Sequence, residues 1–215
     1  TAAPPAAPPV PPMVLSSPAF KDGEMMPVSY GDIRLTNNVN QCGAEARKVS
    51  PALSWVNAPA RTATFVISML DVDAGLGAAH FIAYDIPREK SGLAENELND
   101  PKGFVAGKNY RTENYSGPCP PAGPAHHYVI TLIATDLPIG ALKAGMTRDE
   151  VLAAVVGHNV GGDVTSATEQ LLVFQDTDQF QARSHAALVA AQNVNLVVHD
   201  AQSLSLINPA RETPP

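Results

Sequence analysis

The segment Thr64–Leu70 (TFVISML) is a nearly continuous run of apolar residues. Such a run, of strand length and bounded by turn residues, is typical of a strand buried on both faces of a sheet. Two other segments have the same character: His80–Ile86 (HFIAYDI), which Pro87 terminates, and His127–Ala134 (HYVITLIA). Because loops rich in Gly, Pro, Asn and Asp separate these runs, the sequence predicts a β-rich domain with only a few peripheral helices.

One helix start is clear between the strands and the C-terminus. In Thr147–Glu150 (TRDE) a threonine at the N-cap precedes a glutamate at N3, which is the capping-box pattern. Apolar residues follow at helical spacing, and Gly157 supplies a stop. Weaker patterns predict short strands over 28–35 and 53–55, a second helix over 184–192 and a late strand over 194–198.

The composition argues against several classes of protein. The chain has 215 residues and 45% of them are apolar, so it can bury a core and is not disordered throughout. Its 14 Lys+Arg against 21 Asp+Glu give a net charge of −7, which argues against nucleic acid or an anionic membrane surface as partner. No apolar run reaches the roughly 18 residues of a membrane span, so no transmembrane segment is expected.

The two ends of the chain differ from its middle. Thr1–Pro12 is almost entirely Ala and Pro, which favours a polyproline-like tether ahead of a domain over residues 13–168. Residues 169–215 are a C-terminal extension to which no role is assigned. The tether indicates the mature part of an exported protein, whether periplasmic, secreted or lipid-anchored, after removal of its signal. The alternative is a disordered tail of a cytosolic protein.

Cys42 and Cys119 are the only cysteines. Neither belongs to a C-x-x-C pair, which argues against a zinc knuckle. In an exported protein two such thiols usually form a disulfide. A loop of about 80 residues closed in this way gains about 4–5 kcal/mol in the chain-entropy model. The alternative is two unrelated buried thiols.

Acidic residues follow the first strong strand. Asp71 and Asp73 are two apart, and in extended backbone such residues share a face. Two carboxylates so close favour a cation or a shared proton. His80 opens the next strand and can lie beside them if the two strands are neighbours. The alternative is a solvated turn.

The segment Gly117–Tyr128 (GPCPPAGPAHHY) combines a stiff loop with polar side chains at the start of a strand. His126 and Tyr128 are again two apart and share a face. Imidazole, phenol and free backbone N–H groups are donors suited to a small anion, and a stiff loop loses little entropy on binding. The alternative is a rigid turn with core His and Tyr. Structural roles are assigned to the other histidines singled out: His158, His185 and His199.

These motifs together resemble the phosphatidylethanolamine-binding proteins, also called the Raf kinase inhibitor-like family, and especially its bacterial exported branch. The matching segments occur in family order across about residues 14 to 165. They are Ser50–Trp55 (SPALSW), Asp71–Ala74 (DVDA), His80–Pro87 (HFIAYDIP), Gly107–Tyr110 (GKNY), Gly117–Tyr128 and Gly157–His158. Some exported bacterial members also carry cysteines at the positions of Cys42 and Cys119.

The resemblance implies a mainly β fold, a sandwich on a large central sheet with helices at one end. It also implies a small surface pocket for phosphate or phosphoethanolamine, with no cofactor and no metal. Carried over by motif, the pocket residues are Asp71, Asp73, His80, Pro118, Pro120, Pro121, His126 and Tyr128. The sequence departs from the family pattern at three places that bear on the identity of the ligand. Val72 replaces a proline, Ala79 replaces a bulky residue, and the segment after Thr168 has no counterpart in the family.

The resemblance favours a non-catalytic binding or inhibitory protein. It would hold an anionic small group or block a protein partner of the protease or kinase type. A second hypothesis is an enzyme in which the Asp and His residues perform acid–base work on a phosphoester. Against it, the sequence has neither a G-x-S-x-G nucleophile motif nor an H-E-x-x-H metal motif. A third is an assembly protein, dimeric for example, that acts through the C-terminal extension.

Overall fold

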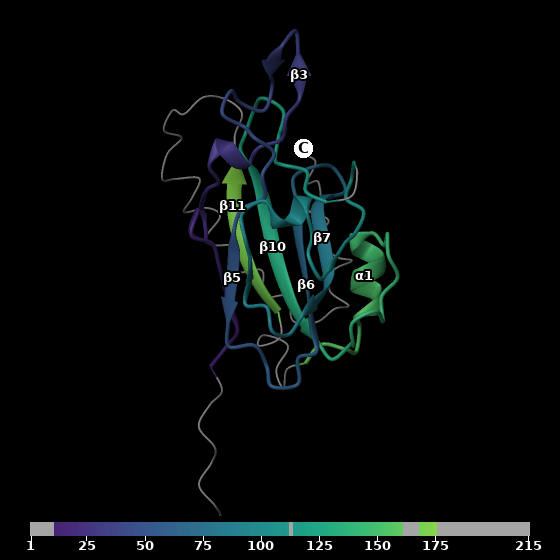
Figure 1. The fold of residues 1–215 in the computed structure, drawn as a ribbon. Helices are drawn as coiled ribbons and strands as arrows, with labels where there is room; N and C mark the ends of the chain where they lie inside the picture. The colour runs from purple at the N-terminus through teal and green to yellow at the C-terminus, as the bar shows by residue number, and fades with distance from the viewer. Residues whose placement is uncertain (1–10, 112–113, 161–167, 176–215) are drawn as a thin grey trace, which may run out of the picture. The chain divides into compact units, whose positions relative to one another are not determined.

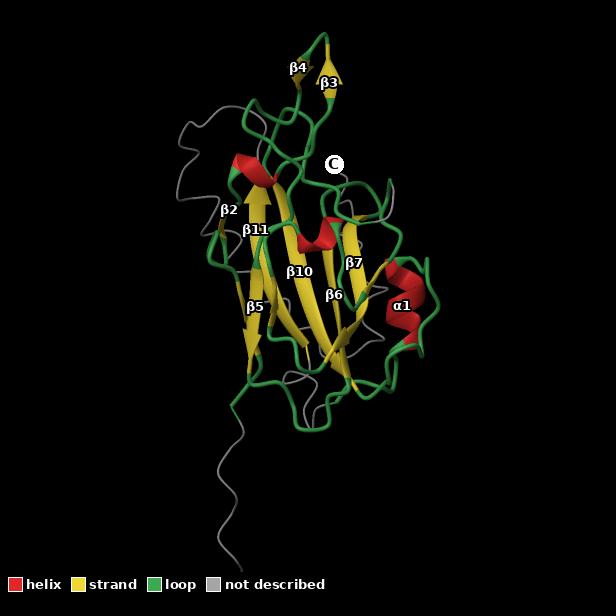
Figure 2. Cartoon of the chain, viewed as in Figure 1, coloured by secondary structure: helices red, strands yellow, loops and turns green. Residues whose placement is uncertain are grey.

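The computed structural model describes residues 11–111, 114–160 and 168–175. This part of the chain is mainly β, as the sequence predicts, with a single α-helix (Figures 1 and 2). The strands are β1 (Val14–Ser16), β2 (Glu24–Met25), β3 (Leu35–Thr36), β4 (Val39–Asn40), β5 (Leu53–Val56), β6 (Thr64–Asp71), β7 (Ala78–Pro87), β8 (Gly92–Leu93), β9 (Val105–Ala106), β10 (His126–Thr135) and β11 (Thr168–Gln175). The helices are α1 (Arg148–Ala154) and two 3-10 turns, η1 (Val28–Tyr30) and η2 (Glu97–Asn99).

A six-stranded sheet forms the centre of the domain, in the order β2-β11-β10-β6-β7-β9. The three apolar runs of the sequence are its long strands β6, β7 and β10, which lie side by side and antiparallel (Figure 1). Strand β11 pairs with β10 from His126 to Ile133, so residues 168–175 belong to this sheet. The sequence predicts His80 beside Asp71 on the condition that their two strands are neighbours. Because β6 and β7 pair with each other, this condition is met.

Both faces of the large sheet are covered, which explains why its strands are apolar at successive positions. On one face, Phe65 of β6 packs edge-on against Trp55 of β5, with ring centroids 5.2 Å apart. Strand β5 belongs to the three-stranded sheet β1-β5-β8, so this side is a sheet-on-sheet sandwich. On the other face, Val66 and Tyr84 pack in one cluster with Val151 of α1. Fully burying each such side chain contributes about 1.5–3 kcal/mol.

Helix α1 begins as the sequence predicts. The Thr147 hydroxyl accepts a hydrogen bond from the Glu150 backbone N–H, and the Glu150 carboxylate accepts one from the Thr147 N–H. The helix ends at Ala154, and Gly157 adopts a positive φ of 81° in the turn that follows. In the part of the chain that the structure describes, no helix is long and apolar enough to cross a membrane.

The weaker sequence patterns have mixed outcomes. The strand over 53–55 is confirmed as β5. The strand predicted over 28–35 is wrong: Val28–Tyr30 forms a 3-10 turn, and only Leu35 enters a strand, in the short β3–β4 hairpin that projects from the domain (Figure 2). The helix over 184–192, the strand over 194–198 and residues 1–10 of the tether lie outside the described residues.

Candidate functional site

Strands β6 and β10 bring Asp71, His126 and Tyr128 together. Tyr128 stands opposite Asp71 in the register of the two strands. His126 precedes Tyr128 by two residues, so its ring lies on the same face, and its Nδ1 is 2.8 Å from Asp71 Oδ2. Beside a carboxylate this Nδ1 carries the proton and donates it. The side chains of His126 and Asp71 are 16% and 5% exposed, so the pair lies at the edge of the core.

His80 reaches the same cluster through a β-bulge. Along β7, Phe81 pairs with Met69 and Ala79 pairs with Leu70, which leaves His80 as an extra residue between the two pairs. A bulge places two residues opposite one and re-aims a side chain that regular alternation would turn away. The His80 ring therefore meets the Tyr128 ring edge to face, with centroids 5.1 Å apart and planes at 87°.

The environment of His80 favours the neutral imidazole. Its Nδ1 donates a hydrogen bond of 2.8 Å to the Ser116 carbonyl, and the Ser116 N–H donates to the His80 carbonyl at 2.9 Å. Burial lowers the pKa of His80, against the opposing effects of the Ser116 carbonyl and the negative charges of Asp71 and Asp32. A neutral ring that donates through Nδ1 presents Nε2 as an acceptor.

The Tyr128 hydroxyl is buried and unsatisfied. Burial, together with the adjacent Asp71 carboxylate, raises the pKa of Tyr128, so the phenol keeps its proton. The hydroxyl lies beside the Asp71 carboxylate, and it makes no hydrogen bond of standard geometry among the described residues. A buried donor left unpaired costs about 1–3 kcal/mol, which a ligand that accepts its hydrogen bond would recover.

The Asp73 carboxylate is hydrogen-bonded to His127, whereas the Asp71 carboxylate is hydrogen-bonded to His126. Asp73 Oδ2 lies 2.6 Å from both the backbone nitrogen and Nδ1 of His127. Strand β6 ends at Asp71, so the shared-face rule for extended backbone does not extend to Asp73, whose N–H turns back to Asp71 Oδ1 at 3.0 Å. Because His127 alternates with His126 and Tyr128 along β10, the Asp73–His127 pair faces the other side of the strand. Sequence reasoning missed His127, although the alternation of His126, His127 and Tyr128 was visible.

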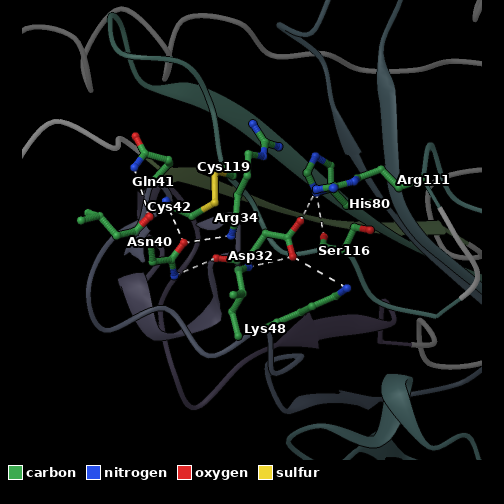
Figure 3. Close-up of a disulfide and its surroundings, with 12 residues drawn as sticks. Asp32, Arg34, Asn40, Gln41, Cys42, Lys48, His80, Arg111, Ser116 and Cys119 are labelled. Atoms are coloured by element: carbon green, nitrogen blue, oxygen red, sulfur yellow. Dashed lines mark hydrogen bonds and ion pairs between the residues drawn. A yellow bond between two sulfur atoms is a disulfide. The ribbon is translucent and has the colours of Figure 1, made fainter. Parts of the chain in front are cut away.

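The Gly117–Pro121 loop is anchored against the segment that leads into the β3–β4 hairpin. The Asp32 N–H donates to the Pro118 carbonyl at 3.0 Å, and Cys119 forms a disulfide with Cys42 (Figure 3). A Cβ on Gly117 would lie 2.6 Å from the Tyr30 carbonyl oxygen, so only glycine allows this approach. Within the loop, two of the predicted ligand-binding prolines, Pro118 and Pro120, are buried, whereas the third, Pro121, is exposed.

Sequence reasoning also missed two residues that border the cluster. The carboxylate of Asp32 is almost completely buried and forms ion pairs with Arg111 Nη1 at 2.7 Å and Lys48 Nζ at 3.8 Å (Figure 3). The ring of Tyr110 packs on His80, with centroids 5.0 Å apart. Asp32 carried no motif signal, whereas Tyr110 belongs to the GKNY segment, one of the segments that carry the family resemblance.

His158 is the remaining histidine of residues 11–111, 114–160 and 168–175. Within them, no group of three or more His, Cys, Asp or Glu side chains is arranged to hold a metal ion. His158 Nδ1 lies 2.9 Å from Asp136 Oδ1, away from the cluster and near the end of β10, in keeping with a structural role. His185 and His199 lie outside the described residues.

The comparisons with known proteins point to one family. The sequence profile described as phosphatidylethanolamine-binding protein matches residues 16–170. A UPF0098 protein of Aquifex aeolicus is 31% identical over 144 residues, covering 65% of this chain and 77% of the relative. The crystal structure of YbcL from Escherichia coli, described as a new member of the mammalian PEBP family, superposes with a TM-score of 0.66 at 23% identity. That match covers 77% of this chain and 99% of YbcL.

One relative bears on cellular location. LppC of Mycobacterium tuberculosis, whose name makes it a candidate lipoprotein, is 32% identical over 141 residues, covering 63% of each chain. The family profile spans both the Asp71–His126 pair and the disulfide-anchored loop, and the solved relative shares the fold. The chain therefore belongs to the phosphatidylethanolamine-binding protein family.

Proposed function

We propose that the protein is a non-catalytic binding protein for a small phosphorylated group. The site consists of Asp71, His80, His126 and Tyr128 with the Gly117–Pro121 loop beside them. The observation that carries the proposal is the Tyr128 hydroxyl, a buried donor without a hydrogen-bond partner among the described residues, on a ring that packs edge to face with His80. Buried polar groups are nearly always paired in native proteins, so an orphan of this kind calls for a missing acceptor.

The hydrogen-bonding capacities of the site and of a phosphomonoester are complementary. Tyr128 donates through its hydroxyl. His126 donates to Asp71 through Nδ1, and its Nε2 becomes a second donor when the ring is protonated, with the Asp71 charge balancing it. Neutral His80 accepts through Nε2, and a phosphomonoester monoanion carries the P–O–H that can donate to it. The phosphate thus finds donors and one acceptor in a single cluster.

Three further observations support this reading. Cys119 is the only cysteine beside the site and lies in a disulfide, so its thiol is not free to act as a nucleophile, which favours binding over catalysis. The disulfide also favours an oxidising compartment, and the similarity to LppC points the same way, so we place the protein outside the cytoplasm. Inhibition of a protease or kinase partner stays a prediction.

A thermal-shift experiment tests the proposal. Phosphate or phosphoethanolamine at a hundred times its dissociation constant should stabilise the wild-type fold by about 2.7 kcal/mol. Tyr128→Phe removes the unsatisfied hydroxyl, so the unliganded variant should be at least as stable as wild type and yet show a smaller shift with phosphate. His126→Ala should lose most of the shift.

Two outcomes would count against a binding protein of this type. The wild type could show no shift with either ligand at millimolar concentration, or Tyr128→Phe could respond as strongly as wild type. Turnover of a generic phosphoester that disappears in Asp71→Asn would instead replace the proposal with the enzyme hypothesis.

A further inference from the structure

A cluster of opposite charges lies beside the proposed phosphate site. The Asp32 carboxylate, whose side chain is 1% exposed, forms ion pairs with Arg111 Nη1 at 2.7 Å and Lys48 Nζ at 3.8 Å. Two cations thus face one buried anion, so the cluster has one positive charge in excess. The side chains of Arg111 and Lys48 are both 41% exposed, which makes this charge accessible from solvent. The excess is local, because the chain as a whole has a net charge of −7.

Several observations place this cluster next to His80. The Asp32 N–H donates to the Pro118 carbonyl at 3.0 Å. Two residues before Pro118, the Ser116 carbonyl accepts a hydrogen bond from His80 Nδ1. Burial lowers the pKa of His80, and the Asp32 charge is close enough to oppose this shift. In Figure 3 the Arg111 side chain reaches Asp32 alongside the His80 ring. An anion bound at His80 is therefore within electrostatic range of the positive excess.

Arg111 is held at both its backbone and its guanidinium. Its backbone N–H donates to Asn109 Oδ1 at 2.8 Å, and Asn109 Nδ2 donates to the His80 carbonyl at 3.2 Å. Its guanidinium donates to Asp32 Oδ2 through Nη1. A guanidinium is planar and has five N–H donors, so it can donate to a carboxylate with one nitrogen and to a second anion with another. Lys48 Nζ is too far from Asp32 to donate a hydrogen bond and contributes charge only.

We propose that Arg111 is a phosphate-binding residue that Asp32 holds in position, and that Lys48 strengthens the site through its charge. The inference rests on the proposed phosphate site and adds a permanent cation to it. His126 is cationic only when its ring is protonated, whereas a guanidinium keeps its charge over the whole physiological pH range. Arg111 therefore supplies the charge-assisted hydrogen bond that a dianionic phosphate needs at neutral pH.

Calorimetric titration of the full chain with inorganic phosphate tests the inference. Arg111→Gln should weaken phosphate binding about tenfold in about 0.05 M sodium chloride, the effect of losing one charge-assisted hydrogen bond. Lys48→Gln should weaken it about twofold, because only a half-exposed charge is lost. Arg61→Gln is the matched control: Arg61 also pairs with an aspartate, Asp136, but just after the far end of β10. This variant should bind phosphate as wild type does.

Salt distinguishes a phosphate contact from an ion pair that only stabilises the fold. Dissolved ions screen the attraction between a half-exposed cation and a bound anion. The ratio of the phosphate affinities of wild type and Arg111→Gln should therefore fall about threefold between about 0.05 M and about 0.5 M sodium chloride. If Arg111 served only to hold Asp32 and its loop in place, this ratio would be the same at both salt concentrations.

The outcomes separate this inference from the proposed function. If wild type does not bind phosphate, the proposed function fails and the inference fails with it. If wild type binds phosphate and Arg111→Gln binds it equally well, or if the affinity ratio does not change with salt, the inference alone is overturned. If Arg111→Gln does not fold, Arg111→Lys decides, because it keeps the charge beside Asp32 and loses the planar guanidinium. Its phosphate affinity should be about threefold lower than that of wild type, and an equal affinity would overturn the inference.

Discussion

Asp71 and Tyr128 stand opposite each other on β6 and β10. The Asp71 carboxylate accepts a hydrogen bond from the ring of His126, which precedes Tyr128 by two residues. Asp73 makes a chemically similar pair with His127 on the other side of the strand. The two pairs are close in sequence and alike in composition, but only one of them faces His80. They therefore provide a matched comparison.

Asp71→Ala should weaken phosphate binding about tenfold, because His126 loses the acceptor that orients it. The same change should lower the free energy of unfolding by about 1–3 kcal/mol, the usual cost of losing a hydrogen bond to a charged group. Calorimetry and urea unfolding measure the two effects. Asp73→Ala is the control and should leave phosphate affinity nearly unchanged. Equal losses of affinity in the two variants would contradict the division of the pairs between the two sides.

Anion binding should strengthen as the pH falls from 8 to 6. Burial lowers the pKa of His80, so the ring is neutral in the free protein, whereas a bound anion raises that pKa. The complex then binds more protons than the free protein, and by linkage affinity rises as protons become available, by up to about tenfold per pH unit. Sulfate is the suitable probe because its charge is constant over this range. In His80→Asn the slope of log affinity against pH should decrease, and an unchanged slope would exclude His80 as a source of the effect.

Asp85 makes stability depend on pH at a position remote from the motif residues of the site. This buried residue has a φ of 54°, its Oδ2 accepts the Gly140 N–H at 2.9 Å, and its Oδ1 has no partner among the described residues. Burial raises the pKa of Asp85. With a folded pKa above the unfolded one, its contribution to stability is fully present below the unfolded pKa and is lost as the pH rises through the folded pKa.

Asp85→Asn should therefore gain stability relative to wild type between pH 4 and pH 7, because asparagine tolerates the positive φ and carries no charge. Urea unfolding at the two pH values measures the difference. Asp85→Ala should be less stable than wild type at both, by about 1–3 kcal/mol, since the Gly140 N–H loses its acceptor. If the free energies of unfolding of wild type and Asp85→Asn differed by the same amount at pH 4 and pH 7, the pH dependence could not be assigned to Asp85.

The disulfide should matter for both stability and binding. Replacing Cys42 and Cys119 by serine should lower the free energy of unfolding by about 4–5 kcal/mol in the chain-entropy model. It should also weaken phosphate binding, because Cys119 lies inside the Gly117–Pro121 loop. Thr147→Ala is the control: it removes the N-cap of α1, costs about 1 kcal/mol and should leave phosphate affinity unchanged. Full phosphate affinity in the serine variant would show that the loop holds its shape without the bridge.

Much of the fold could be predicted from the sequence because its longest strands are buried on both faces. Segments such as Thr64–Leu70 are then apolar at nearly every position, and their short length and flanking turn residues favour a strand over a helix. The region 28–35 was misassigned because its apolar residues are few and several of them, such as Ile33 and Leu35, are exposed in the structure. The pairing of Asp71 with His126 required the register of β6 against β10, which no local pattern encodes.

The candidate site could be predicted less completely. Motifs pointed to His126 and Tyr128. Because these residues are two positions apart in a strand, they were correctly placed on one face. The same rule gave a wrong geometry for Asp73, because the strand ends before that residue. Asp32 and Tyr110 are positioned by tertiary contacts, the Asp32 N–H with the Pro118 carbonyl and the Tyr110 N–H with the Ala79 carbonyl of β7, which no local pattern encodes.

The extra residue in β7 gives this strand an unusual sensitivity to changes in length. His80 faces Tyr128 only because β7 has one residue more than β6 between the pairs Ala79–Leu70 and Phe81–Met69. Deleting a single residue there would restore an even pleat, and a hydrocarbon ring or a methyl group would then occupy the place of the imidazole. A one-codon deletion would thus remove the acceptor nitrogen while keeping the strand, and length changes at this point should be tolerated less well than most replacements.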